Sequence, residues 1–239
     1  MGLILTILVV LVILVILWIV IGWFFKSSTN LTSMSDATKG QKIDASELPS
    51  NDNTSNYTYS TWFYVNDWNY KFGTPKVLLS RLDQDGHPSP SIVLGAIENN
   101  ITVSVACYPQ SQSTGTTGNT SIVHKCEVQN FPLQKWVNLI ISLYGRTFDI
   151  YIDGKLFRTC VLPGVAKVAT DTAIHVTPSG GFDGFTSNFQ YWADSTNPQQ
   201  AYNIYKSGYG GSVLGNLFNK YRIRIEFLED NQVEGSFEI

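Results

Sequence analysis

The chain has 239 residues and a formal net charge of −3, and charged residues make up only 15% of it. No long basic run accompanies this balance, so the sequence lacks the electrostatic footprint of a nucleic-acid-binding protein. Aromatic residues make up 13%, which excludes a disordered tail and is enough to build a packed core.

The N-terminal segment is almost wholly apolar, and no charged side chain occurs from Leu3 to Phe25. As a helix it would be roughly 34 Å long, which matches the hydrocarbon core of a bilayer. Trp18 and Trp23 lie toward its far end, where indole rings prefer the headgroup level, and Lys26 ends it. We therefore predict a single transmembrane anchor over residues 1–26.

Two other N-terminal signals fit this segment less well. A cleaved signal peptide would have a shorter apolar region and a basic start. The first six residues match the N-myristoylation pattern at Gly2, which a spanning helix would make redundant. Lys26, Lys39 and Lys42 follow the apolar run and favour a cytosolic position for the rest of the chain.

The remaining chain divides into a polar segment and a region with the alternation of β-strands. Residues 27–56 are rich in Ser, Thr, Asn and Asp, so we predict a linker there. From Tyr57 onward, alternating apolar residues separated by turn signals predict ten antiparallel strands. These are expected at residues 57–65, 76–81, 91–97, 101–107, 122–128, 136–143, 147–152, 156–162, 173–177 and 184–192.

One short helix and a C-terminal arm complete the prediction. Asn197 is a suitable N-cap, Pro198 suits the first helical turn, and Gly208 is a suitable end, so a helix is expected over residues 197–207. The arm, residues 209–239, starts with a glycine-rich stretch and contains an alternating segment at 221–228. That segment is expected to be an extra strand or an arm that pairs with a neighbouring subunit. The fold class is thus an all-β antiparallel sandwich or jelly roll over residues 57–208.

Several strings resemble laminin-G-like, concanavalin A-like jelly-roll domains. They include the hairpin around Asp153-Gly154, the strand ending in Trp62-Phe63-Tyr64-Val65, and the closing strand at 184–192. Shorter strings resemble the laminin-G-like proteins of large algal DNA viruses of the chlorovirus type. These strings lie at residues 143–146, 158–165, 197–202, 208–211, 221–224 and 236–239.

The viral resemblance implies a membrane-anchored minor capsid protein. Its partners would be the lipid bilayer of the inner viral membrane and the major and other minor capsid proteins. The β domain would lie between the membrane and the capsid, on the cytosolic face of a host membrane during assembly. The alternative function is a membrane-anchored, lectin-like module that binds glycans.

Candidate chemistry within the domain is sparse. Hydrolysis of a glycan needs two carboxylates about 5–9.5 Å apart, and Asp149 and Asp153 are too far apart along one strand, so no enzyme and no cofactor are predicted. Trp68 and Tyr70 lie in a polar stretch and are the candidates for glycan contact. Asp83 and Asp85 resemble part of a calcium loop, which a type I turn explains equally well.

The chain contains three cysteines and five N-glycosylation sequons. Cys107 and Cys126 flank a polar loop and are the first candidates for a disulfide, although a cytosolic domain would keep its thiols reduced. A zinc site from these cysteines, Cys160 and His124 lacks the usual spacing. Five N-glycosylation sequons begin at Asn30, Asn53, Asn56, Asn100 and Asn119. In a cytosolic domain they would be incidental.

Overall fold

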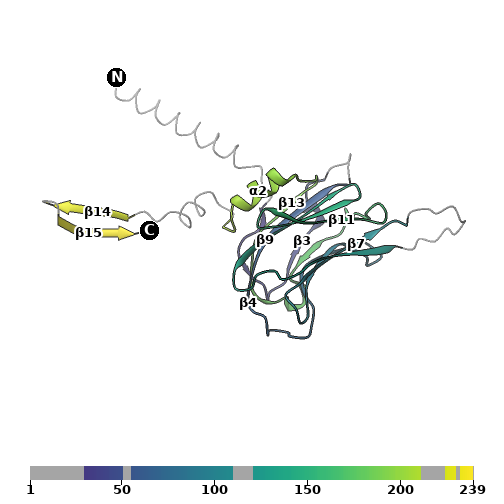
Figure 1. Cartoon of the computed structure of the whole chain (residues 1–239), viewed down its shortest axis with the longest axis horizontal. Helices are drawn as coiled ribbons and strands as arrows, with labels where there is room; N and C mark the ends of the chain where they lie inside the picture. Colours follow the sequence, from purple (N-terminus) through teal and green to yellow (C-terminus); the bar gives the residue numbers. More distant parts are fainter. Residues whose placement is uncertain (1–29, 51–54, 110–120, 211–223, 230–231, 239) are drawn as a thin grey trace, which may run out of the picture.

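The computed structural model describes residues 30–50, 55–109, 121–210, 224–229 and 232–238. Two antiparallel sheets pack face to face, and a short helix, α2, lies against one of them (Figure 1). This arrangement confirms the expected all-β sandwich. The apolar side chains that alternate along the strands meet between the sheets in one continuous core.

The first sheet has β4 (Tyr57–Asp67) and β9 (Trp136–Tyr144) at its centre. Its order is β1-β13-β4-β9-β10-β11, and β2 also pairs with β13. The other strands are β1 (Asn30–Thr32), β2 (Ser35–Asp36), β13 (Asp183–Trp192), β10 (Thr147–Ile152) and β11 (Lys155–Val161). The Asp153-Gly154 turn joins β10 to β11, as its sequence predicts.

The second sheet has the order β3-β12-β5-β6-β7-β8. Its strands are β3 (Gln41–Ile43), β12 (Ile174–Val176), β5 (Lys76–Leu82), β6 (Pro88–Leu94), β7 (Ile101–Cys107) and β8 (Ile122–Val128). All ten predicted strands are present in the two sheets, with ends shifted by a few residues. The strand expected at 91–97 moves most, because a turn occupies residues 95–100.

The prediction of a linker over residues 27–56 is wrong in part. Its described residues form β1, β2, β3 and a 3-10 turn, η1 (Ala45–Glu47). Ala37 and Ile43 reach the common core, and Leu31 and Leu48 pack against it. Strands of two or three residues contribute few buried side chains each, so the segment is polar in composition although it belongs to the domain. The boundary expected at Tyr57 therefore lies nearer the N-terminus.

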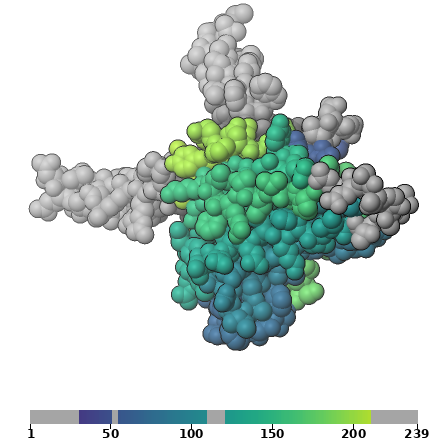
Figure 2. All heavy atoms as spheres, turned by 45° about the vertical axis from the view of Figure 1, so that its right-hand side comes forward, coloured from purple at the N-terminus to yellow at the C-terminus, as the bar shows by residue number. Residues whose placement is uncertain are grey.

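Helix α2 (Pro198–Lys206) packs on the outer face of the first sheet, and Figure 2 shows it in yellow-green at the top of the described domain. The Asn197 side chain caps it by accepting a hydrogen bond from Gln200 N at 2.9 Å. Ala201 of the helix packs with Ile140 and Tyr151 of the sheet in a second apolar cluster. The expected helix is thus confirmed, and it explains why β4 is buried on both faces over most of its length.

The tail contains a two-stranded sheet of its own. β14 (Arg224–Glu229) pairs with β15 (Gln232–Glu238) in antiparallel register. The described residues of the strand expected at 221–228 belong to β14, and its partner is the following segment of the same chain.

The described part of the chain contains no helix with the length and apolar character needed to cross a membrane. The predicted anchor, with Leu3, Trp18, Trp23, Phe25 and Lys26, lies outside the described residues, as does Gly2.

Candidate functional site

A hollow of about 520 Å³ lies where three connections between strands meet. The segment that follows β4, blue in Figure 2, lies at the end of the molecule away from helix α2. The other two connections are the turn from β6 to β7 and the loop from β8 to β9. The lining residues are Trp68, Ile97, Glu98, Asn99, Asn100, Gln129, Asn130 and Leu133. We call this feature the Trp68 hollow. Its volume falls in the range typical of small-molecule sites.

Trp68 is fixed in place by contacts on several sides. Its indole Nε1 donates a hydrogen bond to Ile97 O at 2.7 Å. Its ring meets Phe131 edge to face, with 5.7 Å between centroids. Lys76 Nζ lies 4.2 Å from the centroid of the Trp68 ring. These contacts hold the indole in one orientation before any ligand arrives.

The two loops of the hollow are joined by hydrogen bonds. Asn99 Nδ2 donates to Phe131 O at 2.7 Å, and Phe131 N donates to Asn99 O at 3.0 Å. Asn100 uses both ends of its amide, because Nδ2 donates to Glu98 Oε2 at 2.9 Å and Oδ1 accepts from Asn130 N at 3.3 Å. The backbone of the site is thereby held by the side chains of the residues that line it.

Other lining groups are exposed and available to a ligand. Gln129 and Asn130 are exposed, and no hydrogen bond within the described residues uses their side-chain amides. Ile97 is 64% exposed and supplies an apolar surface beside them. The hollow therefore combines an aromatic and aliphatic wall with amide donors and acceptors. This combination suits a polyol that presents both C–H surfaces and hydroxyl groups.

Tyr70, the second candidate for glycan contact, lies at a different site. Its hydroxyl donates to Gly180 O at 3.1 Å, in the 3-10 turn η2 (Pro178–Gly180). Lys71 Nζ lies 5.5 Å from the centroid of the Tyr70 ring and also bonds Ser179 O. Trp68 lines the hollow and Tyr70 does not, so the structure does not bring the two into one site.

The calcium candidates belong to the turn between β5 and β6. Asp83 Oδ1 accepts hydrogen bonds from Asp85 N at 3.0 Å and His87 N at 2.7 Å, and its Oδ2 lies 3.2 Å from His87 Nδ1. Burial acts to raise the pKa of Asp83, but the bonds and charge from His87 outweigh it and hold the pKa below its usual value. Ligand atoms of Asp83, Asp85 and His87 lie within 4.8 Å of one another. The geometry is that of a turn in which both carboxylate oxygens of Asp83 already contact residues of the turn.

The carboxylates considered for hydrolysis also have structural roles. Asp153 Oδ1 accepts from Asn138 N at 2.9 Å, and its Oδ2 lies 3.3 Å from Lys135 Nζ. Asp149 Oδ1 accepts from Thr159 Oγ1 at 2.6 Å. Neither aspartate lines the Trp68 hollow.

The predicted Cys107–Cys126 disulfide is wrong, because Cys126 pairs with Cys160 instead. On β7 and β8, Cys126 lies opposite Val103 and Cys107 lies opposite Ile122, so the two cysteines are out of register. Cys160, on the edge strand of the other sheet, has its Cα 6.4 Å from that of Cys126. Cys107 is buried and free, and burial raises the pKa of its thiol. The disulfide also uses two ligands of the zinc site that had been considered.

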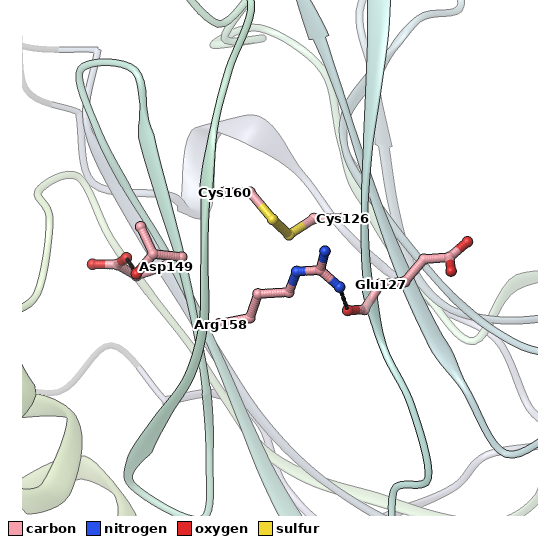
Figure 3. The surroundings of a disulfide bond; sticks show 6 residues. Cys126, Glu127, Asp149, Arg158 and Cys160 are labelled. Carbon is pink, nitrogen blue, oxygen red and sulfur yellow. Dashed lines mark hydrogen bonds between the residues drawn. A yellow bond between two sulfur atoms is a disulfide. The ribbon is translucent and has the colours of Figure 1, made fainter.

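Figure 3 shows the two cysteines pointing toward each other across the gap between the sheets. Beside them, Arg158 Nη1 of β11 donates to Glu127 O of β8 at 2.8 Å. Asp149 lies on the other side of the β11 strand and takes no part in this bridge. The edge strands of the two sheets are therefore joined by a covalent bond and by a hydrogen bond.

The sequence indicated Trp68 but not the other residues of the hollow. Its walls come from segments near residues 68, 98 and 130, which become neighbours only when the sheets form. Asn99-Asn100 marks a turn in the sequence, and Asn130 adopts the left-handed conformation with φ 56°. The Asn99-Asn100 string and the asparagine at position 130 both indicate backbone turns. Neither identifies a ligand-binding residue by itself.

Comparison with known proteins identifies the fold. A family model described as the concanavalin A-like lectin/glucanases superfamily matches residues 36–201. No curated protein sequence matches the chain. A solved structure of the botulinum neurotoxin serotype D binding domain superposes with a TM-score of 0.55 at 14% identity, covering 73% of this chain and 41% of that one.

A second solved structure gives the same result. The receptor binding domain of botulinum neurotoxin D superposes with a TM-score of 0.52 at 14% identity, covering 74% of this chain and 44% of that one. The present chain thus spans less than half the length of these structures. At such identities the likeness shows the fold.

Proposed function

Because the chain belongs to the concanavalin A-like lectin/glucanases superfamily, we propose that its β domain is a non-catalytic module that binds a carbohydrate in the Trp68 hollow. The observation that carries this proposal is the composition of the lining, which combines a fixed indole and the exposed Ile97 with the side-chain amides of Gln129 and Asn130. A sugar ring presents C–H groups that can contact the apolar side chains and hydroxyl groups that can hydrogen-bond to the amides.

The arrangement of carboxylates supports binding without hydrolysis. Glu98 is the single acidic residue in the lining of the hollow. Cleavage of a glycosidic bond needs a pair of carboxylates about 5–9.5 Å apart. Glu98 also accepts a hydrogen bond from Asn100, which holds it in the turn.

Glycan-array binding and titration calorimetry with the domain test this proposal. We expect the double variant Gln129→Ala/Asn130→Gly to lower affinity at least about tenfold, since two polar contacts of about 1 kcal/mol each are removed. Glycine keeps the backbone conformation of Asn130, whose φ is 56°. Gln199→Ala, on the exposed side of helix α2, is the matched control and should bind normally. Equal binding by the double variant, or no glycan bound by the folded domain, would overturn the proposal.

A structural role in a virion is the second candidate, and one surface favours it. A row of paired residues crosses the outer face of the second sheet from Lys42 to Lys125. Between them, in register, lie His175, Ser80, Ser91 and Ser104. This face presents a histidine and three serines between two lysines, which suits a broad contact with another protein. The domain would then connect a membrane anchor at residues 1–26 to a capsid shell.

Limited proteolysis of intact and opened particles separates the two functions. A capsid tether predicts that the domain is protected in intact particles and cleaved after opening. The bulky variant Ser91→Arg should weaken the contact with the shell, whereas Gln199→Ala should not. Cleavage of the domain at equal rates in intact and opened particles would exclude the structural role.

A further inference from the structure

The Cys126–Cys160 disulfide gives information about the compartment in which the domain folds. It joins β8, an edge strand of one sheet, to β11, an edge strand of the other. Disulfides of this structural kind form and persist in oxidising environments such as the lumen of the secretory pathway. The lysines after Phe25 led to the expectation of a cytosolic domain, and the disulfide argues for the opposite side of the membrane.

In that compartment, sequons are substrates for N-glycosylation rather than incidental strings. Two of the five sequons have an asparagine whose side chain the structure describes, namely Asn56 and Asn100. Asn100 Nδ2, the atom that would carry the sugar, donates to Glu98 Oε2 at 2.9 Å. In the folded domain the Asn100 nitrogen is therefore used by a hydrogen bond within the turn beside the Trp68 hollow.

Asn56 differs from Asn100 in the hydrogen bonding of its side-chain nitrogen, Nδ2. Its Oδ1 accepts a hydrogen bond from Gly145 N at 3.0 Å, in the turn between β9 and β10. Within the described residues, its Nδ2 has no hydrogen-bond partner. The Asn56 side chain is partly exposed. Tyr57 pairs with Leu143 in the strand register, and the next residue, Tyr144, is 68% exposed. The oxygen thus fixes the amide while the nitrogen is left for a substituent.

We infer that Asn56 carries an N-linked oligosaccharide, attached in an oxidising compartment at the end of the β9–β10 hairpin. The hydroxyl of Thr58, the third residue of this sequon, is buried in the folded domain and donates to Asp194 O at 2.8 Å. A transferase cannot recognise a buried hydroxyl, so attachment precedes closure of the sheet, and the hydrogen bonds of the folded domain decide only which substituted asparagine it can accommodate. After folding, the sugar extends from Asn56 Nδ2 at the partly exposed end of the hairpin.

The test uses the full chain made in glycosylation-competent eukaryotic cells, with thiols alkylated at lysis. Enzymatic removal of N-glycans in heavy-oxygen water converts each occupied asparagine to a labelled aspartate, which peptide mass spectrometry locates. We expect the label at Asn56, together with a peptide linked through Cys126 and Cys160 and an alkylated Cys107. An unlabelled Asn56 would overturn the inference, and so would alkylation of all three cysteines.

Two matched variants test whether the glycan is attached at Asn56. Asn56→Asp keeps an oxygen acceptor for Gly145 N but cannot be glycosylated. The electrophoretic mobility of the chain should therefore increase by the equivalent of one glycan. Asn100→Asp should leave occupancy at Asn56 unchanged. Because Asn56 does not line the Trp68 hollow, the Asn56→Asp chain should also keep any glycan-array binding.

Discussion

At the scale of single residues, two tyrosines on the core face of β4 have opposite environments. Tyr57 is 1% exposed, and its hydroxyl has no hydrogen-bond partner in the described structure. The Tyr59 hydroxyl accepts a hydrogen bond from Arg81 Nη1 at 3.2 Å, and both residues are buried. Removing the same atom should therefore have opposite effects at the two positions.

We expect Tyr57→Phe to raise the free energy of unfolding by about 1 kcal/mol, because it removes an unsatisfied buried hydroxyl. Tyr59→Phe should lower it by about 2 kcal/mol, because the buried Arg81 loses a partner. Urea denaturation of the two variants and the wild type measures both. A loss of stability in Tyr57→Phe as large as that in Tyr59→Phe would contradict this prediction.

The same tyrosine gives a dependence on pH. Burial raises the pKa of Tyr57 well above its usual value. The unfolded chain then loses its phenolic proton first, so stability is complete below about pH 10 and falls as the pH rises beyond it. Because Tyr57→Phe cannot ionise, its unfolding midpoint should decline less between about pH 9 and about pH 11 than that of the wild type. Parallel curves for the two proteins would show that Tyr57 does not contribute.

Lys76 is a second buried group without a hydrogen-bond partner in the described structure. It is 1% exposed, its Nζ lies over the Trp68 ring, and burial lowers its pKa. Below its folded pKa the buried ammonium is a penalty, and stability rises with pH toward the unfolded value of about 10.4. Lys76→Met keeps the apolar stem over the ring, so we expect a gain of about 1 kcal/mol at neutral pH. Thermal denaturation at pH 7 tests this, with the exposed Lys155→Met as control.

At the scale of elements, the helix cap is the clearest local determinant. Asn197 accepts from Gln200 N, and Gln200 Oε1 accepts from Asn197 N at 3.0 Å, which forms a reciprocal capping box. We expect Asn197→Ala to lower the free energy of unfolding by about 1 kcal/mol. Asn203→Ala, farther along the same helix, should have a smaller effect. Equal losses at the two positions in chemical denaturation would contradict a capping role.

The elements that the sequence predicts well are those whose pattern repeats within one strand or helix. Strand β10 alternates Phe148 and Ile150 toward the core with Asp149 on the other face, and its hairpin is marked by Asp153-Gly154. Strands β1, β2 and β3 have two or three residues each, too few to show a period, so a linker was expected in their place. Local signals fail wherever pairing with a distant strand decides the structure.

The candidate site and the disulfide likewise depend on segments that are distant in the sequence. Trp68 is recognisable because a large aromatic follows a strand in a polar stretch. The role of Asn130 depends on the β6–β7 turn, which is about 30 residues away in the sequence. Cys126 pairs with Cys160 because β8 and β11 are the edges of two sheets that face each other, and no spacing rule encodes that.

At the scale of the whole molecule, the two sheets are connected on one side by the cysteine bridge. Cys126 and Cys160 are separated by 34 residues in the sequence. In the chain-entropy account, closing a loop of this length stabilises the folded state by about 3–4 kcal/mol. The Arg158 hydrogen bond to Glu127 O adds a weaker contact at the same edge.

We therefore expect reduction to lower the free energy of unfolding of the domain by about 3–4 kcal/mol, and Cys126→Ser/Cys160→Ser to reproduce this loss without reductant. Denaturant titrations with and without a thiol reductant measure it. Cys107→Ala is the control, since its thiol is free and its response to reductant should equal that of the wild type. If reductant leaves the wild-type midpoint unchanged, the bridge does not stabilise the sandwich. In that case the chain-entropy account of the bridge fails, because constraining the unfolded chain through Cys126 and Cys160 would leave the free energy of unfolding unchanged.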